Sequence, residues 1–508
     1  MERRAKIMAT LGPASSSGDV VGRMIDAGLD VVRLNLSHGS HDDHRHLIRT
    51  VREQARAKER FIPIVLDLMG PRYRLGEIRG GSRELEKGEV VTLVAEDRGA
   101  EGLPIGDPEL LGHVRVGERV LLDNGLLELE VEASGPEAVR ARVLQGGRVG
   151  SRKGINLPDT DMPFDISAKD REDVAFAVAE DVDYLAASYV HRAADLDALQ
   201  DVVAQSTGGR GGRLPLIAKL ERQGSIDRLE ELVERADAVM VARGDLGVEV
   251  PLHKVPVLQK EIIAAGWRRG KPVIVATQML ESMIEQPRPT RAEASDVANA
   301  TFDGADALML SGETAVGRYP VEAVEVMNRV VLEAEAYEVR AKRARTQPAA
   351  FPTFSGQVAL EAGAESAGAD ETTPLATAEV VSAAAVYASE HLPVRQIVAF
   401  SQGGFTARMV ARNRPDAPIL VFTTDPAVAR RIQLVWGVRP LLMDAEVEHH
   451  DEVVEVVERQ LLETGSARPG EGIVILMGDP IRERPLTNLM RVHWLRGGSA
   501  GAEPEPGP

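Results

Sequence analysis

The sequence contains no cysteine, which excludes disulfide bonds, thiol catalysis and thiolate metal sites. It has no apolar run of the length that crosses a membrane. The charged N-terminus, Met1–Lys6, is not followed by the apolar stretch of a secretory signal. These absences lead us to expect a soluble, cytoplasmic protein that does not act at a membrane.

Aromatic residues make up only 4% of the chain, so its cores must be built mainly from Val, Leu, Ile and Ala. The formal net charge of -18 argues against non-specific nucleic-acid binding. It does not exclude an anionic small substrate, because the charge of a site is independent of the net charge. At 508 residues the chain is too long for one core, and we expect about three or four domains.

Lysine is scarce, since ten of the 60 basic residues are lysines and the rest are arginines. One of the ten, Lys219, lies inside the apolar run Pro215–Glu221, and the next apolar run, Ala238–Asp245, also ends on a carboxylate. A charge inside such a run is costly unless it is paired or takes part in chemistry. This pattern predicts a metal-assisted site for an anionic substrate. A structural buried ion pair is the alternative, because both would look alike in a sequence.

Short apolar runs alternate with amphipathic helical patterns over the first two thirds of the chain. This alternation predicts an α/β fold, and eight such units favour a (β/α)₈ TIM barrel over a doubly wound sheet. Polar residues gather at the ends of the runs, where a barrel builds its active site. The expected strands are Lys6–Thr10, Val31–Leu36, Pro63–Leu68, Tyr184–Val190, Pro215–Glu221, Ala238–Asp245, Pro272–Met279 and Ala307–Thr314.

The predicted barrel is interrupted after its third strand by short β segments with turn signals, which indicate an all-β, barrel-like lid domain over the barrel mouth. A decorative insertion is the alternative. A segment rich in Ala, Gly, Pro and Glu then precedes a separate α/β domain. The expected parts are residues 1–74 and 161–345 for the barrel, 75–160 for the lid, 346–374 for a linker or long loop, 375–496 for the C-terminal α/β effector domain and 497–508 for a disordered tail.

Several motifs, in one order and spacing, resemble the pyruvate kinase family over nearly the whole chain. They are ATLGPAS at Ala9–Ser15, VRLNLSHG at Val32–Gly39, AKLE at Ala218–Glu221, VARGDLGVE at Val241–Glu249, ATQMLESM at Ala276–Met283, PRPTRAEASDVAN at Pro287–Asn299 and LSGET at Leu310–Thr314. The resemblance implies an ATP-forming glycolytic enzyme that transfers the phosphoryl group of phosphoenolpyruvate to ADP and releases pyruvate.

The expected metal ligands are Glu221 and Asp245, whose hard oxygens suit Mg²⁺ or Mn²⁺ with positions left open for substrate. Gly244 and Asp245 begin a strand-to-helix turn whose N–H groups could hold the substrate carboxylate, with the Thr277 hydroxyl as a further donor. Lys219 would stabilise the enolate as the phosphoryl group leaves. Arg33 and Arg74 would neutralise the transferring phosphoryl group.

The resemblance also implies a nucleotide site and a proton path. His38, Lys153 and Asp123 would help to hold ADP together with Arg74 and Asn35. Proton delivery to the enolate carbon has two candidates: Thr277 with an ordered water, or a relay through Ser311. Asn35 and Ser37 could instead be capping residues.

The third-strand motif departs from the common family pattern DTKGPEIR and reads DLMGPRYR at Asp67–Arg74. Arg72 replaces the glutamate that accompanies a K⁺ requirement, and Leu68 replaces the threonine, so the chain resembles the K⁺-independent type. The tethered guanidinium would supply the charge of K⁺ without a binding equilibrium. Asn35, Ser37 and Asp67 would then be former ion ligands, with Asp67 the expected partner of Arg72. In the alternative, Arg72 turns into solvent and K⁺ still binds.

A turn before a helix of the C-terminal domain resembles the family's effector loop and is of the kind that binds phosphate. Its residues are Ser401, Gln402, Gly403, Gly404 and Thr406. Gly403 stands where the family usually has serine, which puts fructose bisphosphate itself in doubt. The resemblance further implies allosteric control and a homotetramer. Two alternative functions are a metal-dependent pyruvate-enolate lyase and an inactive homologue that senses sugar phosphates or nucleotides.

Overall fold

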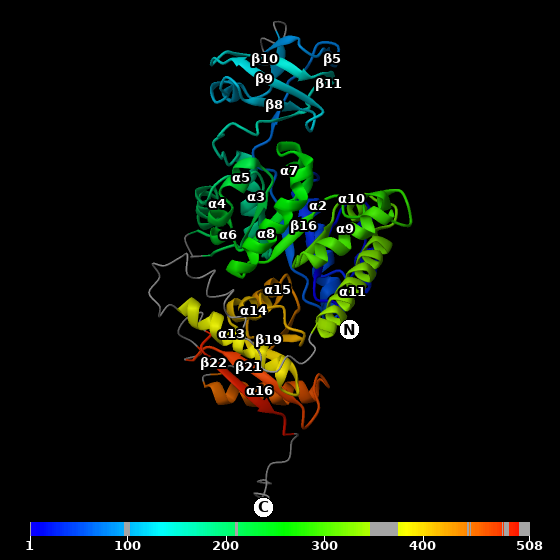
Figure 1. The fold of residues 1–508 in the computed structure, drawn as a ribbon, viewed down its shortest axis with the longest axis vertical. Helices are drawn as coiled ribbons and strands as arrows, with labels where there is room; N and C mark the ends of the chain where they lie inside the picture. Colours follow the sequence, from blue (N-terminus) through cyan, green and yellow to red (C-terminus); the bar gives the residue numbers. More distant parts are fainter. Residues whose placement is uncertain are drawn as a thin grey trace, which may run out of the picture. The chain divides into compact units, whose positions relative to one another are not determined.

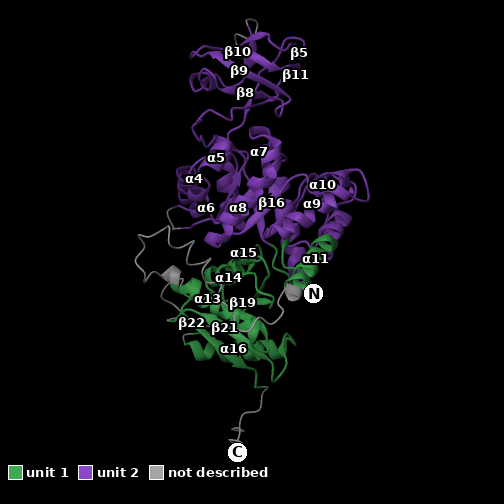
Figure 2. Ribbon diagram, in the orientation of Figure 1, with its two compact units in different colours: residues 1–6, 59–62, 328–508 green, residues 7–58, 63–327 purple. Residues whose placement is uncertain are grey.

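The computed structural model describes residues 2–95, 102–208, 212–345, 374–443, 447, 449–479, 481 and 487–496. The chain divides into two compact units, shown in Figure 2. Unit 1 comprises residues 1–6, 59–62 and 328–508, and unit 2 comprises residues 7–58 and 63–327. None of the described helices is long and apolar enough to span a membrane.

A closed barrel of parallel strands confirms the predicted fold class (Figure 1). The strands neighbour one another in the order β1-β17-β16-β15-β14-β13-β3-β2. Their side chains are buried almost throughout, as expected for a parallel sheet covered by helices on its outer face. The strands are β1 (Lys6–Thr10), β2 (Val31–Asn35), β3 (Ile64–Asp67), β13 (Tyr184–Ala187), β14 (Leu216–Leu220), β15 (Ala238–Ala242), β16 (Val273–Ala276) and β17 (Ala307–Leu310).

The connecting helices begin at residues that suit a helix N-terminus. Ser17, Ser40, Ser167 and Thr290 each accept a hydrogen bond from a backbone N–H of the first turn. The helices are α1 (Gly18–Ala27), α2 (His41–Ala57), α3 (Ala168–Ala179), α4 (Ala193–Ser206), α5 (Gln223–Asp227), α6 (Leu229–Arg235), α7 (Arg243–Glu249), α8 (Val255–Arg269), α9 (Arg291–Phe302), α10 (Gly312–Ala315) and α11 (Pro320–Arg345), with 3₁₀ turns η1 (Pro13–Ser15), η4 (Leu252–Lys254) and η5 (Glu281–Ile284).

Several barrel strands end earlier than the sequence suggested. The run expected as Ala238–Asp245 ends as a strand at Ala242, and helix α7 begins at Arg243. Likewise β16 ends at Ala276, before Thr277 and Gln278. In both cases pairing stops at the last residue of the apolar run, and the polar residues that follow, which the prediction had included in the strands, lie in helix α7 or in the loop after β16.

The β insertion that follows β3 forms its own sheets. Its seven-stranded sheet has the order β4-β12-β8-β9-β10-β6-β7, and β11 pairs separately with β5. The predicted turn at Asp123, Asn124 and Gly125 joins β8 to β9 with positive φ at all three residues (51, 57 and 79°). The elements are β4 (Tyr73–Arg74), β5 (Ser82–Leu85), β6 (Val90–Ala95), β7 (Leu103–Ile105), η3 (Pro108–Gly112), β8 (Arg119–Leu122), β9 (Leu127–Ala133), β10 (Ala138–Gln145), β11 (Gly147–Gly150) and β12 (Gly154–Asn156).

The C-terminal α/β region has a five-stranded sheet of order β20-β19-β18-β21-β22, in which only β22 is antiparallel to its neighbour. Strand β20 was not predicted, because Pro440 interrupts its pattern; proline is tolerated there because β20 is an edge strand. The elements are α13 (Pro374–His391), β18 (Val394–Phe400), α14 (Phe405–Ala411), β19 (Ile419–Thr423), α15 (Pro426–Ile432), β20 (Val438–Leu442), α16 (His450–Glu463), β21 (Gly472–Met477) and β22 (Leu489–Trp494). The predicted linker up to residue 373 and the predicted tail 497–508 lie outside the described residues.

Candidate active site

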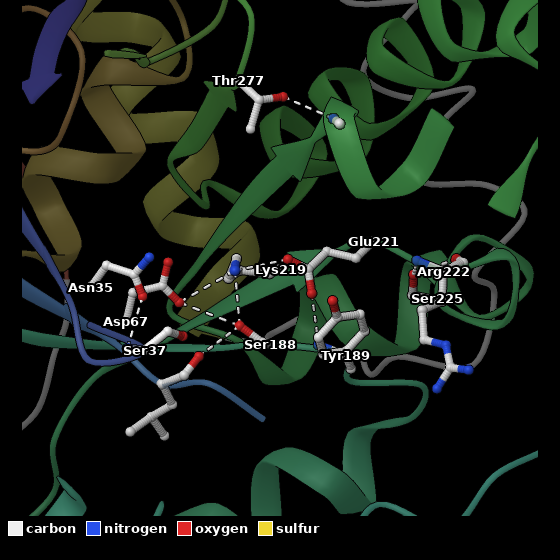
Figure 3. Close-up of polar contacts among 12 residues, drawn as sticks. Asn35, Ser37, Asp67, Ser188, Tyr189, Lys219, Glu221, Arg222, Ser225 and Thr277 are labelled. Atoms are coloured by element: carbon white, nitrogen blue, oxygen red, sulfur yellow. Dashed lines mark hydrogen bonds and ion pairs between the residues drawn. The ribbon is translucent and has the colours of Figure 1, made fainter. Parts of the chain in front are cut away.

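Lys219 lies at the centre of a buried polar cluster at the ends of β3, β13 and β14 (Figure 3). Its Nζ is 2.7 Å from Glu221 Oε1 and 3.3 Å from Asp67 Oδ1. It also donates a hydrogen bond of 2.8 Å to Ser188 Oγ. Because successive strand residues point to opposite faces, Ala218 and Leu220 of the same strand point away from this cluster. One strand therefore supplies both apolar packing and the buried cation.

Asp67 is held by two cations. Arg33 donates from Nε to Asp67 Oδ2 at 2.7 Å, and Lys219 lies on the other carboxylate oxygen. Burial alone would raise the pKa of the Asp67 carboxyl, but the charges of Lys219 and Arg33 outweigh it and hold that pKa below its ordinary value. The expected pairing of Asp67 with Arg72 is therefore wrong. The register of β2 and β3 explains the correction, because it sets Arg33 two residues before the pair Asn35 and Asp67 on adjacent strands.

The charge on Lys219 depends on its two carboxylate neighbours. Burial alone would lower the pKa of Lys219, yet Asp67 and Glu221 raise it above its ordinary value, so the ammonium form is the stable one. Burial raises the pKa of Glu221, and the negative charge of Asp245 adds to this while Lys219 opposes it. The ionised form of Glu221 is thus disfavoured by burial and by the negative charge of Asp245, and Lys219 is the neighbour that stabilises it.

Glu221 and Asp245 fit a divalent cation. Glu221 Oε2 accepts a hydrogen bond of 2.8 Å from the Tyr189 backbone N–H, while no hydrogen bond of good geometry among the described residues reaches Oε1 beside Lys219. The repulsion between these two carboxylates would become attraction if a hard cation lay between them. No group of three or more His, Cys, Asp or Glu side chains among the described residues could hold a metal alone. Such a pair suits an ion that also takes ligands from a substrate.

Helix α7 and the loop after β16 meet at Thr277. The Gly244 N–H donates to Thr277 Oγ1 at 2.8 Å, so the hydroxyl oxygen accepts here while its O–H remains a donor (Figure 3). Thr277 has φ of 69°, a strained conformation for a β-branched residue. Arg243 stabilises it by donating to the Thr277 carbonyl at 2.7 Å. The strained loop fixes a hydroxyl and a helix N-terminus side by side.

A polar cavity of about 300 Å³ opens beside this cluster. Residues from the barrel and from the β insertion line it, so it brings together several of the predicted nucleotide and phosphoryl contacts. Lys153 Nζ lies 3.0 Å from Asp123 Oδ1, and Arg74 donates to the Arg152 carbonyl at 3.0 Å. The lining residues are Pro71, Arg72, Tyr73, Arg74, Asp123, Asn124, Lys153, Gly154, Ile155, Asn156, Tyr189, Arg222, Asp245 and Glu249.

Other predicted site residues do not line this cavity. His38 is exposed, and its carbonyl oxygen is 2.8 Å from His44 Nε2. Asn35 Oδ1 accepts the Ser37 N–H at 3.1 Å, which forms a local turn after β2. The N-cap of α2 is Ser40, so neither Asn35 nor Ser37 caps this helix. The buried Ser311 hydroxyl has no hydrogen-bond partner among the described residues, so it is available to a bound group.

Two residues of the cavity, Tyr189 and Arg222, were missed by the sequence reasoning. The only feature of the sequence that pointed to Tyr189 and Arg222 was that they directly follow Ser188 and Glu221. Two guanidinium groups lie near the Tyr189 ring, with Arg72 Cζ at 5.7 Å and Arg222 Cζ at 6.0 Å from its centroid. Glu249 joins Arg222 to the β insertion: its Oε1 is 3.4 Å from Arg222 Nε and 3.2 Å from Asn156 Nδ2.

The predicted effector residues lie in unit 1, at the start of α14. Ser401, Gly404 and Thr406 are buried, whereas Gln402 and Gly403 are exposed. Gly404 has φ of 77°, and a Cβ added there would lie 2.7 Å from Ile432 Cγ2, so only glycine fits. The hydroxyls of Thr406 and Thr487 lie 2.9 Å apart. The role of this loop stays a prediction.

Comparison with known proteins gives one consistent result. A family model described as the pyruvate kinase barrel domain matches residues 2–324, and one described as the pyruvate kinase alpha/beta domain matches residues 379–493. The chain is 39% identical over 502 residues to a pyruvate kinase of Geobacillus stearothermophilus, covering 97% of this chain and 80% of that protein. It is 38% identical over 496 residues to one from Staphylococcus aureus strain MRSA252, with the same coverages.

The solved structures agree. A crystal structure of a pyruvate kinase from Cryptosporidium parvum is similar with a TM-score of 0.84 and 32% sequence identity, over 97% of this chain and 96% of that chain.

Proposed function

Because this chain belongs to the pyruvate kinase family, we propose that the cluster around Lys219 is where it transfers the phosphoryl group of phosphoenolpyruvate to ADP. The observation that carries this proposal is the buried Lys219 between Asp67 and Glu221, beside a cavity lined with arginines. A fixed cation in a low-dielectric site stabilises charge that develops as a bond breaks. The enzyme is a phosphotransferase, and its substrates are phosphoenolpyruvate and ADP.

Each charged residue of the site has a separate role in phosphoryl transfer. Lys219 stabilises the enolate oxygen that forms when the phosphoryl group leaves. Arg33 and Arg74 neutralise the phosphoryl oxygens. The Thr277 O–H and the backbone N–H groups of Gly244 and Asp245 bind the substrate carboxylate. The Gly244 N–H does so by exchanging its hydrogen bond to Thr277 Oγ1. Proton delivery to the enolate carbon falls to Thr277 with a water or to Ser311, whose hydroxyl has no partner among the described residues.

On the nucleotide side, Lys153, Asp123 and Arg74 all line the cavity, and we assign them to ADP. Asn35 and His38 would act from outside the cavity lining. A bound Mg²⁺, held by Glu221 and Asp245, would supply positive charge to the substrate oxygens; Mn²⁺ would serve the same ligands.

The activity is tested most directly by a lactate dehydrogenase-coupled assay with phosphoenolpyruvate, ADP and Mg²⁺. We expect turnover that requires all three. The inactive homologue predicts binding without turnover, and a pyruvate-enolate lyase predicts no dependence on ADP. Either result would contradict the proposal.

We propose further that the enzyme does not need K⁺. Oxygens expected at the monovalent-cation position already have partners: Asp67 is bound by Arg33 and Lys219, and Asn35 Oδ1 accepts from Ser37. Leu68 is buried and offers no side-chain oxygen. Burial alone would lower the pKa of Arg72, but Tyr189, Asp245 and Glu221 raise it. The Arg72 guanidinium therefore remains protonated and positively charged near Asp245 and Glu221.

In K⁺-free buffer with a bulky organic cation, we expect the enzyme to keep nearly full activity. Arg72→Glu should lower the rate steeply, and added K⁺ should restore part of it, because the carboxylate recreates an ion ligand. Arg79→Glu, a charge reversal at another exposed arginine of the β insertion, is the matched control and should respond to K⁺ like the unchanged enzyme. A strict K⁺ requirement in the unchanged enzyme would sink this proposal.

Location and assembly stay predictions. The family resemblance implies a cytoplasmic homotetramer, and we propose that the loop from Ser401 to Thr406 binds a phosphorylated effector, its identity left open by Gly403. What supports this is the loop's position at the start of α14, because the first N–H groups of a helix have no partner within the helix and attract phosphate.

A further inference from the structure

Tyr189 stands in a backbone conformation that its side chain disfavours. It follows β13 with φ of 60°, and its side chain is buried. A bulky residue in the left-handed region costs on the order of 1–3 kcal/mol, and such strain persists only where the surroundings fix it. Here the fixing contact is the Tyr189 backbone N–H, which donates to Glu221 Oε2 at 2.8 Å. The strained residue is thus attached to a candidate metal ligand.

The same conformation turns the ring toward the cavity. Arg72 Cζ lies 5.7 Å from the ring centroid, within the range in which an aromatic face attracts a cation. Arg72 as a whole residue is exposed, although its guanidinium is partly desolvated. None of the described carboxylates forms an ion pair with it within 4.0 Å. Its guanidinium would otherwise be free to turn into solvent. Tyr189 is the contact that keeps this charge in the cavity.

We propose that Tyr189 is a positioning residue whose ring holds the Arg72 guanidinium beside Glu221 and Asp245, so that the charge replacing a monovalent cation stays in place during turnover. This inference rests on the proposed role of Arg72 in place of K⁺. It goes beyond that role because it names what orders an arginine on a flexible side chain. The Arg222 guanidinium, 6.0 Å from the same centroid, supports the ring from a paired and buried position.

A double-mutant cycle tests the coupling. Tyr189→Leu should lower kcat/KM for phosphoenolpyruvate about 10-fold in the unchanged enzyme and less than about twofold in an Arg72→Met background, because residues that act through each other are not additive. Tyr189→Phe keeps the ring and removes the hydroxyl, which also contacts Arg72. If the ring holds Arg72, this variant should stay within about twofold of the unchanged enzyme; a loss as large as that of Tyr189→Leu would assign the contact to the hydroxyl and contradict the role of the ring. Tyr73→Leu is the matched control, a second tyrosine of the same cavity, and its effect should be the same in both backgrounds.

A second arm keeps the shape of the ring. Phenylalanine with increasing fluorine substitution at position 189 weakens the attraction of the ring face for a cation without removing the ring. Activity should fall with each fluorine when Arg72 is present and stay level in Arg72→Met. This arm decides the matter if Tyr189→Leu fails to fold.

The outcomes separate the inference from its premise. If Arg72→Met loses activity but the Tyr189 effects are the same in both backgrounds, the positioning role is wrong and the role of Arg72 stands. If Arg72→Met keeps full activity without K⁺, then Arg72 does not replace the ion, and both proposals fall.

Discussion

Lys219→Met is expected to keep binding phosphoenolpyruvate and the metal while losing most of its turnover. Loss of a preorganised donor that stabilises charge in the transition state costs about 10²–10³ in rate. The structure gives the reason for the separation: Lys219 Nζ contacts Asp67, Glu221 and Ser188 and is buried. Methionine fills a similar volume but carries no charge. Asp67 keeps Arg33 as a partner, so one of the two carboxylates stays neutralised.

The loss must be separated from unfolding. Removing one partner of a buried ion pair can destabilise a protein by about 3–5 kcal/mol, so thermal denaturation should accompany the kinetics. Lys87→Met, at an exposed lysine of the β insertion, is the control. Fluorescence titration would measure the binding of phosphoenolpyruvate, and single-turnover kinetics would measure the rate of phosphoryl transfer. A folded Lys219→Met enzyme that turns over at nearly the unchanged rate would mean that Lys219 has only a structural role.

The barrel could be predicted because each strand is a short apolar run followed by a helix pattern, and eight such units fit few folds. The strand ends could not. At Ala242 pairing stops and α7 begins with Arg243, although the sequence prediction carried the strand on to Asp245. Strand β20 was missed because a proline such as Pro440 argues against a strand. Proline is tolerated in β20 because β20 lies at the edge of the sheet.

At the site, the types of residue in the sequence predicted which side chains gather there, but they did not predict which side chains pair with each other. A lysine and two carboxylates at strand ends pointed to a charged site, and the structure brings Lys219 and Glu221 within 2.7 Å. The partner of Asp67 was wrong because it depends on strand register, which puts Arg33 closer than Arg72. The left-handed backbones of Tyr189 and Thr277 left no mark in the sequence, since such residues rarely adopt them.

The second large effect concerns the metal ligands. Asp245→Asn and Glu221→Gln keep the shape of each side chain but remove one negative charge, so both should bind Mn²⁺ more weakly and raise the Mg²⁺ concentration needed for activity. Changes outside the ligands of a metal already cost about 10–100-fold in affinity, so we expect about 100-fold or more for a ligand. Binding of Mn²⁺ measured by electron paramagnetic resonance, without substrate turnover, gives a readout independent of rate.

The two substitutions should differ in a way that the cluster explains. Glu221→Gln also removes a partner of Lys219, whose raised pKa depends on Asp67 and Glu221 together, so its maximum rate should fall further. Asp245 is only half-buried and faces the cavity, so Asp245→Asn should act mainly through the metal, and excess Mg²⁺ should restore more of its rate. Asp227→Asn, an exposed carboxylate of α5, is the control. Metal affinity unchanged in both Asp245→Asn and Glu221→Gln would remove these residues from the metal site.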